Sequence, residues 1–192
     1  MSLLRRLSSR RSTARTSMMT KRNPRTLSSG ANNTVIALSE SEVGKLFHGD
    51  TRSDIGSEAE KMQEANAVNN LVVGFRRLDV NEELDADMLV MERLYPMDFR
   101  AYEQQRRLLW LDVFEGELRQ LHASGFCHRE LRRPSDQLGH RYDNVFLTTE
   151  GLHLILVGIS ALRRTVGERL FGRFIERELE ELELFRDEFL AR

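Results

Sequence analysis

The sequence of 192 residues contains a single cysteine, Cys127, and no apolar run near the length of about 18 residues that a membrane span requires. One cysteine excludes a disulfide framework within the chain and a zinc cluster built on several cysteines. A reducing compartment is therefore favoured, and we expect an intracellular, cytoplasmic protein. Cys127 itself is expected to be a small buried residue, with a reactive thiol as the alternative.

Acidic residues are missing from the first part of the chain. Residues 1–39 hold eight of the 29 Lys and Arg residues and no Asp or Glu, so the remainder carries a net charge of about −9. Three interpretations remain open: an organelle-targeting segment, a tail that touches nucleic acid or an anionic surface, and upstream sequence without a role. Residues 1–29 are predicted to be disordered. The whole is 40% hydrophobic and 31% charged, as in soluble globular proteins.

A hairpin is predicted just after this basic segment. The β-branched run 34–38 and the apolar run 43–47 are separated by a polar turn. Strand alternation places Lys45 on the same face as Val43 and Phe47, where a charge is costly unless an acid or an anion pairs with it. The alternative is an edge-strand lysine whose ammonium reaches water.

A helix over residues 57–67 is predicted to follow the hairpin. Ser57 is the N-cap candidate, with Glu60 three residues later as in a capping box. Glu60 and Glu64 share one helical face, so either is a candidate partner for Lys45. Beyond this helix, residues 71–75 and 88–91 are predicted strands on either side of a charged turn.

The second half of the chain is predicted to be mostly helical. A short helix is expected at 99–105, a long one at 107–124 and a last one from about Val166, all from apolar residues three and four apart. His122 lies on the apolar stripe of the long helix and is predicted to be a hydrogen-bonded core histidine. Trp110 is predicted to serve packing.

The segment LHASGFCHREL, Leu121 to Leu131, resembles the catalytic loop of protein kinases. In that family an Asp after His-Arg is the catalytic base, and this chain has Glu130 there. The resemblance implies a structural role for His128 and an organising role for Arg129. It also implies that Asn144, in YDNVFLT, binds magnesium, with Asp143 as a candidate substitute ligand.

The segment MLVMERL, Met88 to Leu94, is similar to the last N-lobe strand and hinge of a kinase. The resemblance implies that Met91 closes the back of a nucleotide pocket, and that the backbone of Glu92 to Leu94 faces an adenine. It further implies that Lys45, paired with Glu60, holds the α- and β-phosphates of ATP.

Several kinase features are missing. Leu156 stands where the family has the Asp that holds Mg²⁺, so magnesium binding is expected to be weak. Gly30 is the only glycine where a glycine-rich loop would lie. An arginine-rich insertion, 132–141, is a candidate docking loop for a phosphate or an acidic partner, with a solvated loop as the alternative.

The implied fold is α+β: a kinase-like two-lobe arrangement with a tail at 1–29, an N-lobe at 30–94 and a truncated, mostly helical C-lobe at 95–192. Three functions are carried forward. The first is a catalytically impaired kinase-like module that binds ATP and a protein partner, the second an active small Ser/Thr protein kinase, and the third a non-enzymatic α+β interaction domain. Exposed apolar residues on the last helix make a homodimer a further expectation.

Overall fold

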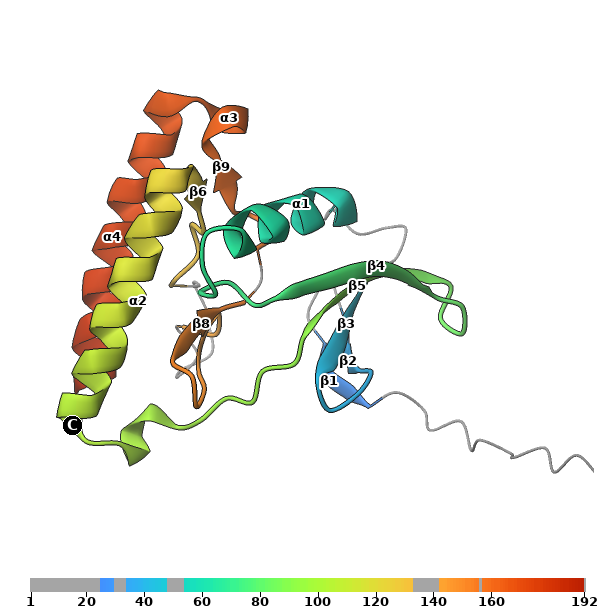
Figure 1. Ribbon diagram of the computed structural model, residues 1–192, viewed down its shortest axis with the longest axis horizontal. Coiled ribbons are helices and arrows are strands. Elements are labelled where there is room, and N and C mark those ends of the chain that lie inside the picture. The colour runs from blue at the N-terminus through green and yellow to red at the C-terminus, as the bar shows by residue number, and fades with distance from the viewer. Residues whose placement is uncertain (1–24, 30–33, 48–53, 133–141, 156, 192) are drawn as a thin grey trace, which may run out of the picture.

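A five-stranded antiparallel sheet forms one side of the molecule, and two long helices form the other (Figure 1). The computed structural model describes residues 25–29, 34–47, 54–132, 142–155 and 157–191. This mixed arrangement confirms the predicted α+β class. Within the described residues, no helix combines the length and the apolar character needed to cross a membrane.

The sheet has the strand order β1-β2-β3-β5-β4. Its strands are β1 (Thr26–Ser29), β2 (Thr34–Ala37), β3 (Glu42–Phe47), β4 (Phe75–Asn81) and β5 (Ala86–Glu92). The predicted hairpin is confirmed, since β2 and β3 pair antiparallel. The predicted disorder up to residue 29 is wrong at its end, because β1 pairs with β2.

The predicted strand at 71–75 is wrong. Leu71 to Val73 form a buried connection, in which Val73 donates its backbone N–H to the carbonyl of Leu154. The strand begins instead at Phe75 and runs through residues that were assigned in part to a charged turn. β4 is an edge strand, so its charged side chains stay in water, and it lacks the apolar pattern by which buried strands are recognised.

The central strands β3 and β5 carry buried residues on both faces of the sheet. One face carries a small apolar cluster of Ile36, Leu46, Ala86, Met88 and Val90. Gly44 lies on this face, where a Cβ atom would stand 2.3 Å from the sulfur of Met88. The opposite face, with Val43, Phe47, Leu89 and Met91, joins the main core.

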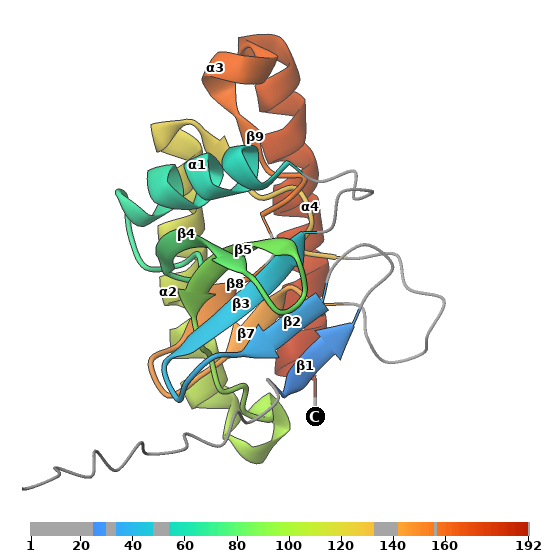
Figure 2. The same ribbon diagram turned by 90° about the vertical axis from the view of Figure 1, so that its right-hand side faces the viewer.

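Helix α1 (Ile55–Asn66) lies against the main-core face of the sheet, as Figure 2 shows beside β4. Its N-cap is Asp54, whose carboxylate accepts the backbone N–H of Ser57. Ser57, the predicted cap, therefore lies inside the first turn. The helix buries Ala59, Met62 and Ala65, which recur at the spacing of one helical face.

Helices α2 (Gln104–Ser124) and α4 (Glu168–Leu190) pack side by side and run antiparallel (Figure 1). Both were predicted, and their apolar stripes face each other, with the rings of Phe114 and Phe185 5.8 Å apart. The short helix predicted before α2 is a single 3-10 turn, η1 (Phe99–Ala101). A one-turn helix, α3 (Arg163–Val166), precedes α4.

Two small two-stranded sheets connect the long helices to the large sheet. β6 (Phe126–Cys127) pairs with β9 (Ala161–Leu162), and β7 (Val145–Leu147) forms a hairpin with β8 (Leu152–Leu154). One apolar core runs from the inner face of the large sheet through this hairpin to α2 and α4.

Candidate functional site

A cavity of about 570 Å³ opens between the large sheet, the connection that follows β5, and the β7–β8 hairpin. Its volume and mainly apolar walls are those of a site for a small organic molecule. The walls are formed by Leu27, Val35, Val43, Val73, Met91, Glu92, Arg93, Leu94, Tyr95, Pro96, Asp143, Phe146 and Ile155.

Lys45 is not among the residues that line this cavity, but its neighbours are. Val43, two residues earlier on the same face of β3, and Val35, opposite Lys45 on β2, both line the cavity. The ammonium group donates to both carboxylate oxygens of Glu58, at 2.9 and 2.7 Å. Only 4% of Lys45 and 2% of Glu58 are exposed. Lys45 is thus a buried, paired lysine on a central strand, and the edge-strand alternative is wrong.

The prediction that Glu60 or Glu64 pairs with Lys45 is also wrong. Two residues along a helix are about 200° apart, so Glu60 faces away from the sheet that Glu58 contacts. Both Glu60 and Glu64 instead form ion pairs with Arg164 of α3, at 2.7 Å for Glu60. Lys61 adds a third link, because its ammonium donates to the carbonyl of Gly158 at 2.8 Å.

The residues predicted to form a hinge do reach the cavity. Met91 is buried in its wall. Glu92, the last residue of β5, and Leu94, in the connection that follows, also line the cavity. The backbone N–H of Glu92 is donated to Gly74, and that of Arg93 to Ser41. The N–H of Leu94 has no backbone partner among the described residues.

The loop after β6 is held in an unusual backbone conformation. Arg129 has a φ of 73°, a value that non-glycine residues rarely adopt. Its guanidinium donates to the carbonyl of Ile159 at 2.9 Å and stacks over the ring of Phe174, 3.9 Å from the ring centre. These contacts fix the segment that carries Glu130.

Glu130 and Asn144, predicted to act together, are joined in the structure. The Asn144 side-chain N–H donates to the backbone carbonyl of Glu130 at 2.8 Å. Asn144 is fully buried, and its side-chain oxygen has no partner within the described residues. A buried acceptor left in this way is an incomplete site for a proton donor or a cation. Asp143, the neighbouring residue, lines the cavity.

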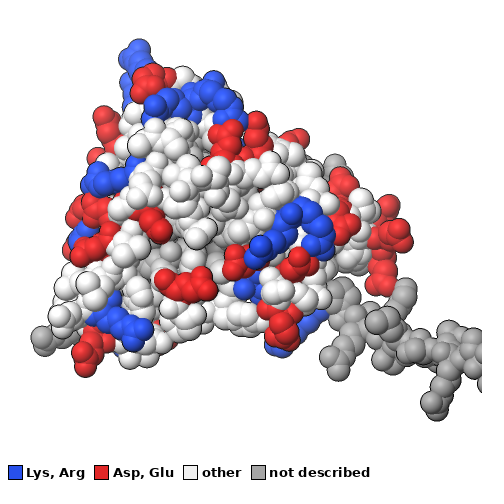
Figure 3. Space-filling view, viewed as in Figure 1, with Lys and Arg blue, Asp and Glu red and all other residues white. Residues whose placement is uncertain are grey.

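Other predicted features fall partly outside the described residues. The structure does not describe Leu156, residues 133–141 of the arginine-rich insertion or residues 1–24 of the basic tail. Arg132 is described and borders a second hollow of about 180 Å³ with Glu130 and Arg177. On the face seen in Figure 3, basic and acidic side chains are interspersed, and acidic ones gather where the β4–β5 turn projects.

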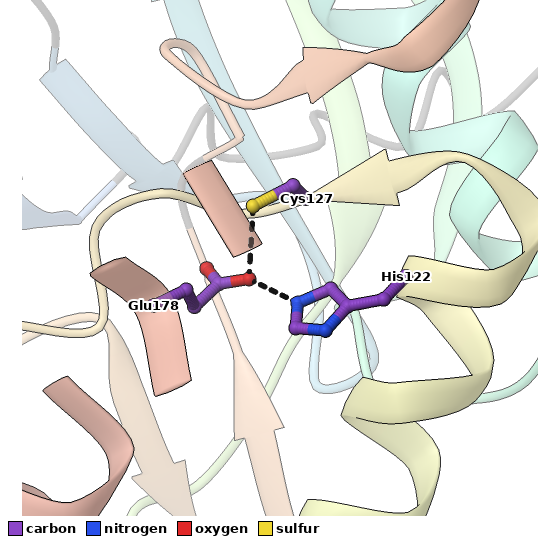
Figure 4. Close-up of side chains that lie close together, drawn as sticks. All are labelled: His122, Cys127 and Glu178. Carbon is purple, nitrogen blue, oxygen red and sulfur yellow. Dashed lines mark hydrogen bonds and ion pairs between the residues drawn. The ribbon is translucent and has the colours of Figure 1, made fainter. Parts of the chain in front are cut away.

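Glu178 of α4 is a site residue that the sequence analysis missed. Its carboxylate lies 2.6 Å from Nε2 of His122 and accepts from the Cys127 thiol at 3.1 Å (Figure 4). It also accepts the backbone N–H groups of His128 and Arg129. Since a carboxylate only accepts, His122 must carry its proton on Nε2. This confirms His122 as a hydrogen-bonded core histidine and Cys127 as a buried residue.

The spacing of Glu178 from apolar residues of the same helix could have identified it from the sequence. It lies four residues before Leu182 and seven before Phe185, and so falls on the buried apolar stripe of α4. Of the other acids around it, Glu180 and Glu183 are exposed, whereas Glu181 is also buried. A carboxylate on an apolar helical face requires internal partners.

The charge of Glu178 is maintained by its surroundings. Burial alone would raise the pKa of this carboxyl, but the hydrogen bond from His122 and the charges of His128 and His122 hold the pKa below its usual value. For the Cys127 thiol, burial and the neighbouring Glu178 carboxylate raise the pKa. The cluster therefore holds an ionised carboxylate beside a protonated thiol.

His122, Cys127 and Glu178 also offer nitrogen, sulfur and oxygen ligand atoms within 4.8 Å of one another. Such a set suits Zn²⁺ in its donor types. In the structure these atoms satisfy one another, because Glu178 accepts from both His122 and Cys127. The cluster forms a closed hydrogen-bond network that anchors the loop after β6.

Comparison with protein-family models and with curated proteins found no match for this chain.

Proposed function

We propose that this chain is a kinase-like module with impaired catalysis, which binds a nucleotide or nucleoside in the cavity beneath its large sheet. The observation that carries the proposal is the buried Lys45–Glu58 ion pair, formed by a strand whose Val43 lines a cavity of about 570 Å³. The kinase resemblance implied a strand lysine paired with a helix glutamate. The helix supplies that glutamate two residues before the one expected.

Three further features support a two-lobe, kinase-like arrangement. The connection from β5 to α2 forms one wall of the cavity, where the resemblance implied a hinge. The loop with Arg129 and Glu130 is joined through Asn144 to the β7–β8 hairpin. The long pair α2 and α4 makes up a helical half after that connection.

Impaired catalysis follows from the residues available. Glu130 has one more methylene than the Asp that kinases use, and displacements near 1 Å at a reacting group cost orders of magnitude in rate. The oxygen of Asn144 and the carboxylate of Asp143 would hold a magnesium ion, which would screen phosphate charge. With Leu156 in place of the expected Asp, that donor set is small for a hard cation.

Thermal unfolding of the full chain with adenosine, ATP and ATP with Mg²⁺ tests the proposal. A ligand at 100 times its Kd should stabilise the fold by about 2.7 kcal/mol, which is a measurable rise in Tm. The absence of a rise with every one of these ligands would contradict the proposed function and favour the interaction-domain alternative.

A pair of matched variants locates the binding site. Val35→Trp fills the cavity from β2 and should abolish the ligand-induced rise in Tm. Val80→Trp makes the same change on the exposed edge strand β4, where Val80 is 57% exposed, and should leave the rise intact. Equal responses from the two variants would place binding elsewhere.

The second candidate is an active small Ser/Thr kinase. The side-chain oxygen of Asn144, which has no partner within the described part of the chain, favours it. This candidate predicts a rise in Tm with ATP that increases when Mg²⁺ is added. It also predicts that Leu156→Asp, which supplies a metal ligand, increases transfer of phosphate to a generic Ser/Thr substrate. A rise that is independent of Mg²⁺ supports the impaired module instead.

A further inference from the structure

The outer side of β4 is a free edge of the large sheet. β4 is the last strand in the order of the sheet, and among the described residues no strand pairs with its outer side. Residues 76–80 are all exposed, and the turn of the β4–β5 hairpin projects from the body of the molecule (Figure 1). Such an edge presents backbone N–H and C=O groups with which another strand can pair.

Val80 directs its backbone N–H to this outer edge. The N–H is donated to the Asp79 carboxylate at 2.9 Å, a side chain of the same strand. Adjacent residues of an antiparallel strand alternate in the direction of their backbone groups. Leu78, two residues before Val80, therefore faces outward as well.

The register of the β4–β5 ladder gives the same direction for Leu78 independently. Glu92 of β5 donates its N–H to the carbonyl of Gly74, which immediately precedes β4. Alternation along β5 then turns Leu89, three residues before Glu92, toward β3. Leu89 stands opposite Leu78, so these two residues do not exchange backbone hydrogen bonds, and the backbone groups of Leu78 point away from β5.

The same two outward-facing residues leave apolar side chains in water. Leu78 is 48% exposed and Val80 is 57% exposed. A strand paired with β4 would bring its own side chains to about 5 Å from these, measured between Cβ atoms. Pairing at this edge would therefore remove apolar surface from water.

The charges along β4 match those of a second, antiparallel copy of the same strand. With a two-fold axis at Leu78, this residue lies opposite its own copy, and Arg77 lies opposite Asp79 on both sides of the axis. The outward backbone groups of the two Leu78 residues then meet, as a hydrogen-bonded pair requires. A register centred on Arg77 or on Asp79 would instead place like charges face to face.

The ion pairs that Arg77 already forms leave room for this contact. Its Nη1 donates to Glu42 at 2.8 Å, and its Nε lies 3.3 Å from Asp79 of the same chain. Within the described part of the chain, Nη2 of Arg77 has no ion-pair partner. Because the Arg77 and Asp79 side chains are 47% and 45% exposed, their pairs rearrange in water at small cost.

We propose that β4 pairs with the β4 of a second copy of this chain across a two-fold axis at Leu78, which joins the two five-stranded sheets into one. The partner is a second copy because the charges of β4 complement those of its own antiparallel copy. The interface is separate from the cavity, since no residue of β4 is among the described residues that line the cavity. The proposal is therefore independent of the proposed function.

Sedimentation velocity of the full chain at increasing concentration tests the proposal. The wild type should pass from monomer to dimer. Asp79→Arg places two arginines face to face on both sides of the axis and should raise the Kd of the dimer roughly tenfold. Asp112→Arg makes the same change at an exposed position of α2 and should leave the Kd unchanged. A wild type that stays monomeric at every concentration, or equal Kd values for the two variants, would overturn the inference.

A second pair of variants tests the register. Arg77→Asp places two acids face to face and should weaken the dimer as Asp79→Arg does. In an equal mixture of Arg77→Asp and Asp79→Arg, opposite charges meet again at both positions, so a heterodimer should form with a Kd near that of the wild type. Both positions are exposed, and circular dichroism establishes that each variant is folded. A mixture that associates no more tightly than the separate variants would contradict the pairing of β4 with β4.

Discussion

At the scale of single residues, Glu178 carries the largest concentration of polar contacts in the described core. It joins α4 to α2 through His122 and to the loop after β6 through the N–H groups of His128 and Arg129. We expect Glu178→Gln to lower the free energy of unfolding by about 3 kcal/mol, because an amide cannot accept from all these donors. Urea unfolding measures this. Glu180→Gln, an exposed change on the same helix, should stay within about 0.5 kcal/mol of the wild type, and an equal loss there would contradict the assignment.

The same carboxylate makes stability depend on pH. Its folded-state pKa is lowered, so the folded chain binds fewer protons than the unfolded chain. The stabilisation is present above the ordinary carboxyl pKa of about 4.3, and it is lost as pH falls through the lowered folded-state value. We expect the stability gap between the wild type and Glu178→Gln to narrow as pH falls from 6 to about 3. If this difference in unfolding free energy, measured by urea titration, stays constant over the pH range, the loss of stability in Glu178→Gln arises from packing and not from the charge of Glu178.

At the scale of elements, helix α1 forms a buried ion pair with the sheet through Glu58 and exposed ion pairs with α3 through Glu60 and Glu64. Lys45→Met leaves Glu58 buried without its partner and should cost about 3 to 5 kcal/mol of unfolding free energy. The double variant Lys45→Met with Glu58→Leu should recover most of this loss. Arg164→Ala removes only exposed pairs to Glu60 and Glu64 and should cost about 1 kcal/mol or less. Chemical denaturation of the wild type and the three variants measures the free energy of unfolding of each. A double variant that is no more stable than Lys45→Met would contradict the expected order of stabilities.

At the scale of the whole molecule, one core connects the sheet to the helical half. Val43 and Leu89 of the sheet belong to the same apolar cluster as Leu111 of α2 and Phe185 of α4. We expect the described part to unfold in a single transition. Fluorescence of Trp110, the only tryptophan, reports on α2, and far-ultraviolet circular dichroism reports on all elements. Coincident midpoints would bear this out, whereas two separated transitions would show that the two halves unfold independently.

The parts of the fold that sequence predicted are those with a regular apolar pattern. Residues 34–47 alternate as strands do, and α2 and α4 carry apolar residues at helical spacing. β4 was not predicted because it is an exposed edge strand in which charged residues, Arg76, Arg77 and Asp79, interrupt the apolar pattern. The start of α1 was misplaced since Asp54 and Ser57 are both good capping residues, and only the backbone decides between them.

The sequence pointed to several residues at or near the candidate site, but it did not predict which of them contact one another. Sequence motifs pointed to Lys45, Met91, Leu94 and Asn144. Met91 and Leu94 line one cavity, whereas Lys45 does not line it and is paired with Glu58. The partner of Lys45 was missed because three glutamates lie within about two turns of α1, and the face toward the sheet selects Glu58. Pairing of this kind depends on tertiary packing, which local spacing does not encode.

Gly44 has a consequence for how this protein can change over evolutionary time. Its lack of a side chain makes room for Met88 across the β3–β5 ladder, where a Cβ atom would stand 2.3 Å from the methionine sulfur. A larger residue at position 44 therefore requires Met88 to move or to be replaced by a smaller residue. Among homologous sequences, these two positions should vary as a pair, with the sum of their side-chain volumes nearly constant.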